Sequence, residues 1–405
     1  MAKGFAPRLE AKNKKTGTRL QSLPSISEVQ DNLLSYVEEV KDPRSPRTQK
    51  HLLKDILVIA ILAVIAGAEG WEDMESYGLS KSLWLKEFLV LPNGIPSDDT
   101  FRRIFERIDP TELERILARW LQGILGSWVG EVVSIDGKCL RGSYDREKGI
   151  KALSLLTAWA GKQQLILGQV KVENKSNEIP AIPTLLKLLD LQEAVVTIDA
   201  IGTQVEIVRQ IQAQKADYVL ALKKNHPTLY TQLEEEFKSL RKSPDDSSEF
   251  SDEQRLEKGL HRLEKRRVWA ISVSKFTHLH HQEQWCGLQT IVVVERIRHL
   301  WNKTTREVQF YLSSLSANAS LFGKIIRQHW EIKNQVHWIL DVTFNEDSCR
   351  IRSGHSPHNL ALLRHWALNV LRQETTLQRS LRQKQKRAAM NNDYMTTILK
   401  AFCQA

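Results

Sequence analysis

The chain has 405 residues, 41% of them hydrophobic, and its 58 lysines and arginines outnumber its 48 aspartates and glutamates to give a net charge of +10. This length predicts two or three domains, and the apolar content excludes an intrinsically disordered protein. The basic excess weakly favours a polyanionic partner, most simply nucleic acid.

Cysteine spacing and hydropathy indicate the compartment. The four cysteines form no CxxC pair, so we predict free thiols in a reducing, cytoplasmic environment. The apolar run at residues 56–68 is 13 residues long, with Asp55 before it and Glu69 after it. A membrane-spanning helix needs roughly 20 residues, so we predict a buried core helix and no membrane segment.

The first part of the chain is predicted to be helical. Residues 1–25 predict a disordered basic arm, and residues 26–125 predict an all-helical N-terminal domain with capping residues and apolar periodicity. Its predicted helices cover residues 29–40, 52–68, 101–108 and 113–125.

From residue 130 short β-branched runs replace the helical pattern. Three strands joined by polar turns predict an antiparallel meander, which two helices and two more strands follow. The strands cover residues 132–136, 152–160, 164–172, 194–199 and 217–223, and the helices cover residues 179–189 and 203–214. This order matches the ribonuclease-H-like α/β topology, a mixed sheet with flanking helices whose first and fourth strands are neighbours.

The remaining chain interrupts and then completes this domain. Residues 224–310 predict a β-rich insertion, which includes a polar loop at residues 243–257. A strong helix over residues 321–340 resumes the ribonuclease-H-like domain, which we place at residues 130–372. Residues 373–405 predict a basic C-terminal tail.

The first and fourth predicted strands each end in an aspartate. Asp136 follows the run 132–135, and Asp199 follows the run 195–198. Two carboxylates on neighbouring strands need a cation between them, and oxygen ligands favour Mg²⁺ or Mn²⁺. The pair therefore predicts a catalytic centre for phosphoryl transfer with two metal ions. Each aspartate alone could equally form a turn or cap a helix.

Several basic side chains are candidates for contact with DNA phosphates. They lie near the aspartates, on the basic helix 101–108 or on the polar face of the helix 321–340, and they are Lys138, Lys223, His329, Lys333, Arg102 and Arg103. Each could equally be a solvated surface residue. His329 and His337 share a face with Lys333, and a lysine between them argues against a zinc site.

These motifs resemble those of the DDE-type insertion-sequence transposases also called H-repeat-associated proteins. The similarity runs from about residue 30 to the C-terminus through the segments 42–44, 55–67, 96–103, 135–138, 141–143, 175–179, 197–200, 217–223, 329–330, 340–347 and 359–361. The resemblance implies DNA transposition: a phosphodiester is cleaved at the element end, and the freed 3′-hydroxyl attacks target DNA. It also implies two Mg²⁺ or Mn²⁺ ions, double-stranded DNA as the partner, and a homodimer on that DNA.

This chain departs from the family at the third acid. The family helix normally reads His-Trp-x-Ile-Glu-Asn, and its glutamate completes the acid triad, whereas this chain has Lys333 there. A lysine repels a divalent ion. Either another acid substitutes (Glu331, Glu346 or Asp347), or this copy binds DNA without cutting it. A structural or regulatory basic protein whose aspartates only cap turns is a third hypothesis.

Overall fold

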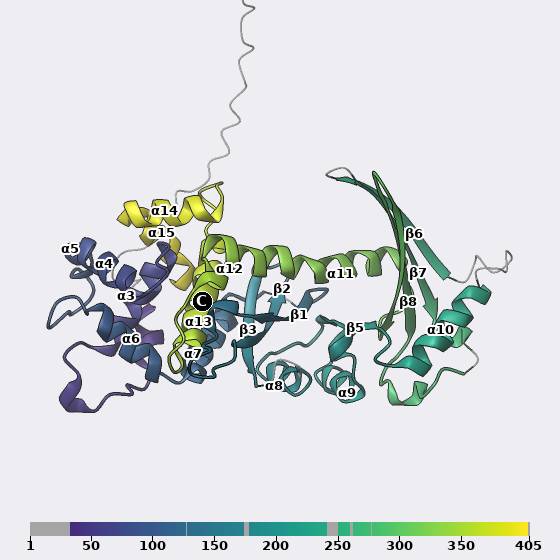
Figure 1. Ribbon diagram of the computed structural model, residues 1–405, viewed down its shortest axis with the longest axis horizontal. Helices are drawn as coiled ribbons and strands as arrows, with labels where there is room; N and C mark the ends of the chain where they lie inside the picture. The colour runs from purple at the N-terminus through teal and green to yellow at the C-terminus, as the bar shows by residue number, and fades with distance from the viewer. Residues whose placement is uncertain are drawn as a thin grey trace, which may run out of the picture.

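The computed structural model describes residues 33–126, 128–173, 178–240, 250–259, 262–276 and 278–403. The predicted basic arm at residues 1–25 therefore lies outside the described residues. Figure 1 shows an elongated molecule with helices at one end, a sheet flanked by helices in the centre, and a curved β extension at the other end.

Helices form the N-terminal end of the described chain, as predicted. They are α2 (Ser35–Glu38), α3 (Leu53–Ile65), α4 (Trp71–Ser80), α5 (Ser82–Leu85), α6 (Asp98–Arg107) and α7 (Pro110–Ile124). Every residue of α3 except Lys54 is buried, which confirms the predicted core helix. No helix within the described ranges is long and apolar enough to cross a bilayer.

The centre of the molecule is a mixed sheet of nine strands in the order β3-β2-β1-β4-β5-β9-β8-β7-β6. The predicted meander is present, and β4 and β5 run parallel to β1. These strands are β1 (Val132–Cys139), β2 (Ser154–Ala160), β3 (Leu165–Val172), β4 (Val195–Ile198) and β5 (Asp217–Leu222). The predicted mixed sheet, with its first and fourth strands adjacent, is therefore confirmed.

Helices cover both faces of this sheet. Helices α8 (Ala181–Lys187) and α9 (Val205–Ala213) lie on one face, and α11 (Ala319–Ile332) crosses the other (Figure 1). A π-helical turn, Lys333–His337, joins α11 to α12 (Trp338–Thr343). Single 3₁₀ turns lie at Pro46–Thr48, Arg141–Ser143 (η3), Ala200–Gly202 (η4), Val273–Lys275, Gln282–Gln284 and Glu346–Ser348 (η9).

The predicted insertion continues the same sheet. It begins with α10 (Pro227–Leu240) and supplies β6 (Phe250–Gly259), β7 (Arg262–Ser272), β8 (Thr290–Leu300) and β9 (Thr304–Ser313). Strand β9 pairs antiparallel with β5. The prediction of a loop over 243–257 is wrong for residues 250–257, which lie in β6, because backbone pairing with β7 holds this edge strand without an apolar pattern.

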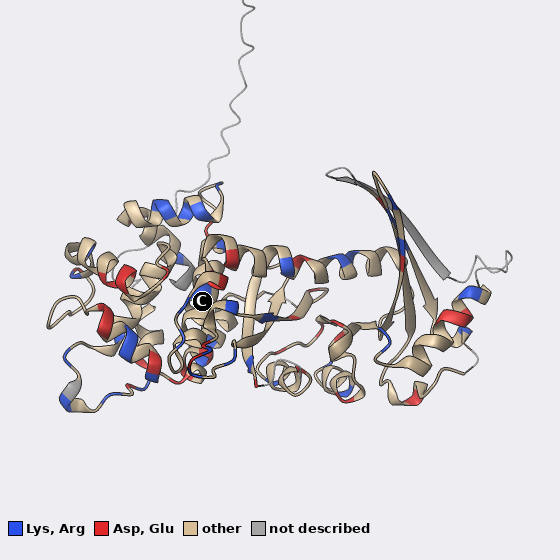
Figure 2. Ribbon diagram, in the orientation of Figure 1, with Lys and Arg blue, Asp and Glu red and all other residues tan. Residues whose placement is uncertain are grey.

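The C-terminal segment is folded where it is described. Helix α13 (Ser356–Gln373) packs against α3 and α7, and the predicted basic tail forms α14 (Leu381–Met390) and α15 (Asn392–Cys403). Figure 2 shows lysines and arginines along α14. The apolar core is shared, because buried residues of α3, β1 and α13 belong to one continuous cluster.

Candidate active site

The parallel pairing of β1 and β4 brings the two strand-end aspartates together. Ser134 is opposite Thr197 and Ile135 is opposite Ile198. Asp136 and Asp199 are the next residues on these adjacent strands, so their side chains leave the sheet at the same edge. The two runs form these strands because every residue except Ser134 is β-branched and all of them are buried.

Asp136 is a buried carboxyl group with acidic neighbours. Its side chain is only 10% exposed. Burial raises the pKa of Asp136 to about 7; the ammonium of Lys333 opposes this rise, and the carboxylates of Asp199 and Glu178 add to it. The site therefore favours a positive charge beside Asp136.

Asp199 lies at the end of β4 and also caps the helical turn that follows. It is half-buried, and its Oδ1 accepts a hydrogen bond of 3.1 Å from the backbone N–H of Ile201. This bond caps η4, so the helix-capping role left open by the sequence does exist. This cap uses Oδ1 and leaves Oδ2 outside the capping bond.

Glu178 is a third acid that lies in the family-like segment 175–179 but was not among the predicted site residues. It lies just before α8, and a Cβ atom at Gly137 would be 2.2 Å from its Oε1. Only glycine at 137 therefore permits this approach. Burial and the charge of Asp199 raise the pKa of Glu178. The signal in the sequence is the family-like segment 175–179, but nothing local places Glu178 near Gly137.

The helix across the sheet supplies a cation and a neutral imidazole. Lys333 Nζ lies 3.9 Å from Asp136 Oδ2, and His337 Nδ1 lies 3.5 Å from the same oxygen. Both residues belong to the π turn, a helix irregularity that is frequent at functional sites. Burial lowers the pKa of His337 to about 3, so the positive charge beside Asp136 comes from Lys333.

His329 connects the same helix to the two acid-bearing strands. Its Nδ1 is 3.0 Å from Thr197 Oγ1, and that hydroxyl donates a hydrogen bond of 3.2 Å to Ser134 Oγ. Burial lowers the pKa of His329 to about 4, which makes the ring neutral at physiological pH. The structure thus places His329 as a buried link between α11, β4 and β1.

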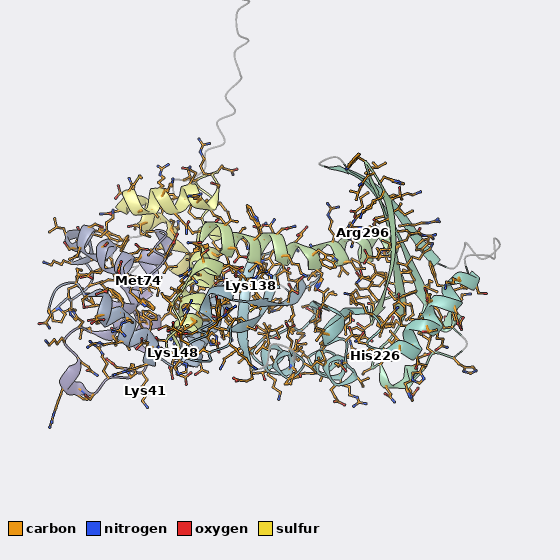
Figure 3. The ribbon with its side chains drawn as sticks, viewed as in Figure 1. Lys41, Met74, Lys138, Lys148, His226 and Arg296 are labelled. Atoms are coloured by element: carbon orange, nitrogen blue, oxygen red, sulfur yellow. The ribbon has the colours of Figure 1, made fainter. Side chains whose placement is uncertain are left out.

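Lys138 is held inside the protein. Its Nζ donates to Asp341 Oδ1 at 2.5 Å and to Glu346 Oε2 at 2.6 Å, and Figure 3 locates it near the centre of the molecule. Glu346 is buried, and Arg364 lies 3.8 Å from it. Two of the alternatives for the third acid are thus engaged elsewhere, because Asp347 also pairs with Arg141 at 3.6 Å.

The other predicted phosphate contacts lie at two separate places in the fold. Lys223 is exposed at the end of β5, the strand beside β4. Arg102 and Arg103 lie on α6 among the N-terminal helices, and both pair with Asp99. Of the basic residues that the sequence proposed, Lys333 is thus the one whose charge lies against the acid pair.

The donors suit a hard divalent ion in their chemistry. Carboxylate oxygens are the ligands that Mg²⁺ and Mn²⁺ prefer. The ammonium of Lys333 lies beside Asp136, where a metal ion would also be attracted. Within the described ranges, no three His, Cys, Asp or Glu side chains form a preassembled metal-binding group. Asp136 and Asp199 suit an ion by ligand type and charge alone, and Lys333 competes with it for Asp136.

Comparisons with known proteins identify the family of this chain. Residues 34–121 match the family described as "DDE_Tnp_1-associated", and residues 127–370 match the family described as "Transposase DDE domain". YncI of Escherichia coli O157:H7 is 36% identical over 91% of this chain and 94% of that protein. The H repeat-associated protein YhhI of Escherichia coli K12 is 35% identical over 91% of this chain and 97% of that protein.

Both relatives carry the word transposase in their names. A solved structure, the piggyBac transposase synaptic complex with hairpin DNA, aligns with 93% of this chain and 78% of that one at a TM-score of 0.38 and 13% identity. The DDE-domain match alone spans more than half of the sequence and includes both aspartates. This chain therefore belongs to the DDE transposase family.

Proposed function

We propose that this protein is a DNA transposase that cleaves a DNA strand at the ends of an insertion sequence and transfers that end to target DNA. The observation that carries the proposal is the parallel register of β1 and β4, which makes Asp136 and Asp199 neighbours at one sheet edge. Membership of the DDE family gives these two acids their expected catalytic role.

The residues of the centre have distinct tasks in this proposal. Asp136 and Asp199 hold Mg²⁺ or Mn²⁺, which when bound supplies positive charge to the in-line displacement at phosphorus. Burial keeps the pKa of Asp136 near 7, so a cation favours its ionised form. His329 and the π turn fix the helix that closes the site.

The partner in this proposal is double-stranded DNA. The chain carries a net charge of +10, and the aligned piggyBac structure is a complex with DNA. Exposed Lys223 and half-exposed Lys333 lie at or near the acid edge, where they can meet phosphate groups. A homodimer that pairs two element ends, and a cytoplasmic location, stay predictions.

A cleavage assay on labelled duplexes that carry the flanking inverted repeats tests this function. We expect wild-type protein to nick the element end in Mg²⁺ or Mn²⁺, and Asp136→Asn and Asp199→Asn to lose at least about 100-fold in rate while still binding DNA. Equal cleavage by Asp136→Asn and wild type would refute the proposal.

A second candidate function is DNA binding without cleavage. The distance of 3.9 Å between Lys333 Nζ and Asp136 Oδ2 favours it, because the ammonium already neutralises part of the charge that would attract a metal ion. This candidate predicts an inert wild type and a Lys333→Glu variant that cuts in the same assay. Cutting by the wild type excludes it.

A further inference from the structure

We propose that the projecting ends of β7, β8 and β9 form an arm that binds double-stranded DNA. Three arginines of this arm, Arg266, Arg296 and Arg298, contact phosphate groups. Trp301, at the tip, stacks against a base of the same DNA. The inference rests on the proposed function and extends it, because it names the part of the chain that holds DNA beside the acid centre.

The arm projects from the edge of the sheet at which the two aspartates lie. Asp199 directly follows β4, which runs parallel to β5. Leu222, the last residue of β5, is opposite Phe310 of β9, and β9 begins at Thr304. The chain from 304 to 310 therefore carries β9 roughly 20 Å beyond the end of β5. Figure 1 shows these strands extending past α11 at one end of the molecule.

The projecting strands carry an excess of positive charge. Residues 263–267 and 295–307 together contain seven lysines and arginines and three glutamates. Figure 2 shows lysines and arginines on these strands, and Figure 3 marks Arg296 among them. An excess of four positive charges on one extension complements a polyanion such as duplex DNA.

The three arginines surround one buried carboxylate. The side chain of Glu264 is 8% exposed, and its Oε1 lies 2.8 Å from Arg266 Nη2 and 3.7 Å from Arg296 Nε. Its Oε2 accepts a hydrogen bond of 3.2 Å from Arg298 Nε. Glu307 is opposite Arg296 on β9, so this face still has more arginines than glutamates. Because Glu264 already holds the guanidinium groups in place, they lose little side-chain freedom when they bind phosphate.

The same face of the arm leads to the acid centre. Val268 lies two residues beyond Arg266 on this face and belongs to one apolar cluster with Ile325 of α11. After α11, Lys333 Nζ lies 4.8 Å from the ring centre of Trp330 and 3.9 Å from Asp136 Oδ2. A duplex that lies along α11 can therefore contact the arginines while one of its phosphates reaches the acids.

Trp301 is the feature of the arm that fits a base. It occupies the turn between β8 and β9, and 90% of its surface is exposed. Asn302 and Lys303 follow it, and both are exposed. A single aromatic ring among polar and basic residues suits a nucleic acid, because bases stack on such rings, whereas a protein partner favours a wider apolar patch.

Anisotropy titrations of a labelled duplex that carries the flanking inverted repeat, with the full chain in EDTA, test the inference without a cleavage step. We expect Arg298→Gln to reduce the slope of log affinity against log salt by about one, and Arg298→Lys to retain the slope. Glu264 keeps Arg266 as its partner in both variants, so the fold is retained.

Arg209→Gln is the matched control, because Arg209 is a 54% exposed arginine of α9, across the central sheet from α11. This variant should bind the duplex as the wild type does. An unchanged slope in both Arg298→Gln and Arg296→Gln would overturn the inference, and so would an equal loss of slope in Arg209→Gln.

Trp301→Ala provides a variant with a different physical basis. Loss of one stacked base should weaken binding roughly tenfold, and the salt slope should stay the same because an indole releases no counterion. Trp301→Phe should recover most of the affinity. Wild-type affinity in Trp301→Ala would overturn the assignment of the tip.

Failure of the proposed function looks different from failure of this inference. A wild type that needs the arm to bind end DNA and leaves that DNA uncut in Mn²⁺ refutes cleavage and supports the arm. A wild type that cuts, with arm variants that bind and cut equally well, overturns the arm and leaves the function in place. Absence of DNA binding by the wild type overturns both.

Discussion

Lys138 forms buried ion pairs with Asp341 and Glu346 instead of facing DNA as the sequence suggested. Its position two residues after Asp136 suggests a phosphate contact, but its ammonium lies between Asp341 and Glu346, and its side chain is 10% exposed. Burial lowers the pKa of Lys138, and the two carboxylates raise it by more. The contact ties β1 to α12 and η9, which makes Lys138 a structural residue next to the acid centre.

We therefore expect Lys138→Met to destabilise the fold by about 3–5 kcal/mol, because it leaves Glu346 buried without its main cation. Urea unfolding measures this loss. Lys223→Met, at an exposed position, should change stability by less than about 0.5 kcal/mol, and Glu346→Gln should rescue part of the loss in the double variant. A Lys138→Met protein of wild-type stability with weakened DNA binding would contradict this assignment.

His329 predicts a loss of stability in acid. Burial lowers the pKa of His329 from its ordinary 6.5 to about 4, so the unfolded chain takes up this proton first. The stability linked to this group is complete above about pH 6.5 and falls by up to roughly 3 kcal/mol towards pH 4. Buried His337 and His365 act in the same direction.

Urea midpoints measured between about pH 7.5 and pH 4.5 test this dependence. His329→Asn should flatten the curve in that range, and the slope that remains belongs to the other two histidines and to the carboxyl groups. If His329→Asn leaves the dependence of stability on pH unchanged, His329 accepts a proton as readily in the folded protein as in the unfolded chain.

The two aspartates could be found from the sequence because each follows a local β-branched run, and strand order then made them neighbours. Glu178 could not be found in that way, since its position depends on the packing of α8 against the meander and on the space above Gly137. Nor could the partners of Lys138, which are more than 200 residues away along the chain. Their roles depend on tertiary contacts.

Among the elements, the predicted basic tail contains two packed helices, α14 and α15. Lys384 donates to the carbonyl oxygen of Leu371 at 2.9 Å, and Ile398 is fully buried. Both helices contact α13, which itself lies against α3. The basic residues of α14 thus sit on a helix that also completes the core.

We expect Ile398→Ala to cost about 2–5 kcal/mol, because it opens a cavity between α15 and the rest of the core. Chemical denaturation measures the loss. Lys386→Ala, on the exposed side of α14, is the control and should be nearly neutral. If Ile398→Ala lowers the free energy of unfolding as little as Lys386→Ala does, these helices contribute little to the stability of the fold.

Elements with a clear local period were predictable, and their connections were not. The alternating and β-branched runs of β1 to β5 gave strands close to their observed bounds. Strand β6 was partly missed because its residues are polar, and nothing local indicates that β9 pairs with β5. The π turn at Lys333–His337 could not be predicted from the local sequence. A regular α-helix would also place Lys333 and His337 on one face, so their spacing does not reveal the irregularity.

At the scale of the whole molecule, the net charge of +10 predicts DNA binding that weakens steeply with salt. Electrophoretic or fluorescence titrations at several salt concentrations give the slope of log affinity against log salt. Lys223→Ala should reduce this slope by about one. Lys384→Ala should leave it unchanged, because that side chain is buried against Glu374. A slope that stays near zero would argue against phosphate contacts.

Backbone pairing runs without interruption from the acid-bearing strands to the outermost strand of the insertion. Strand β9 occupies the edge that β5 would otherwise present to solvent. A shortened chain that lacks the segment between α10 and α11 would therefore leave one side of β5 (Asp217–Leu222) unpaired and open to pairing with another chain. The insertion therefore protects a strand edge of the same sheet that carries Asp136 and Asp199.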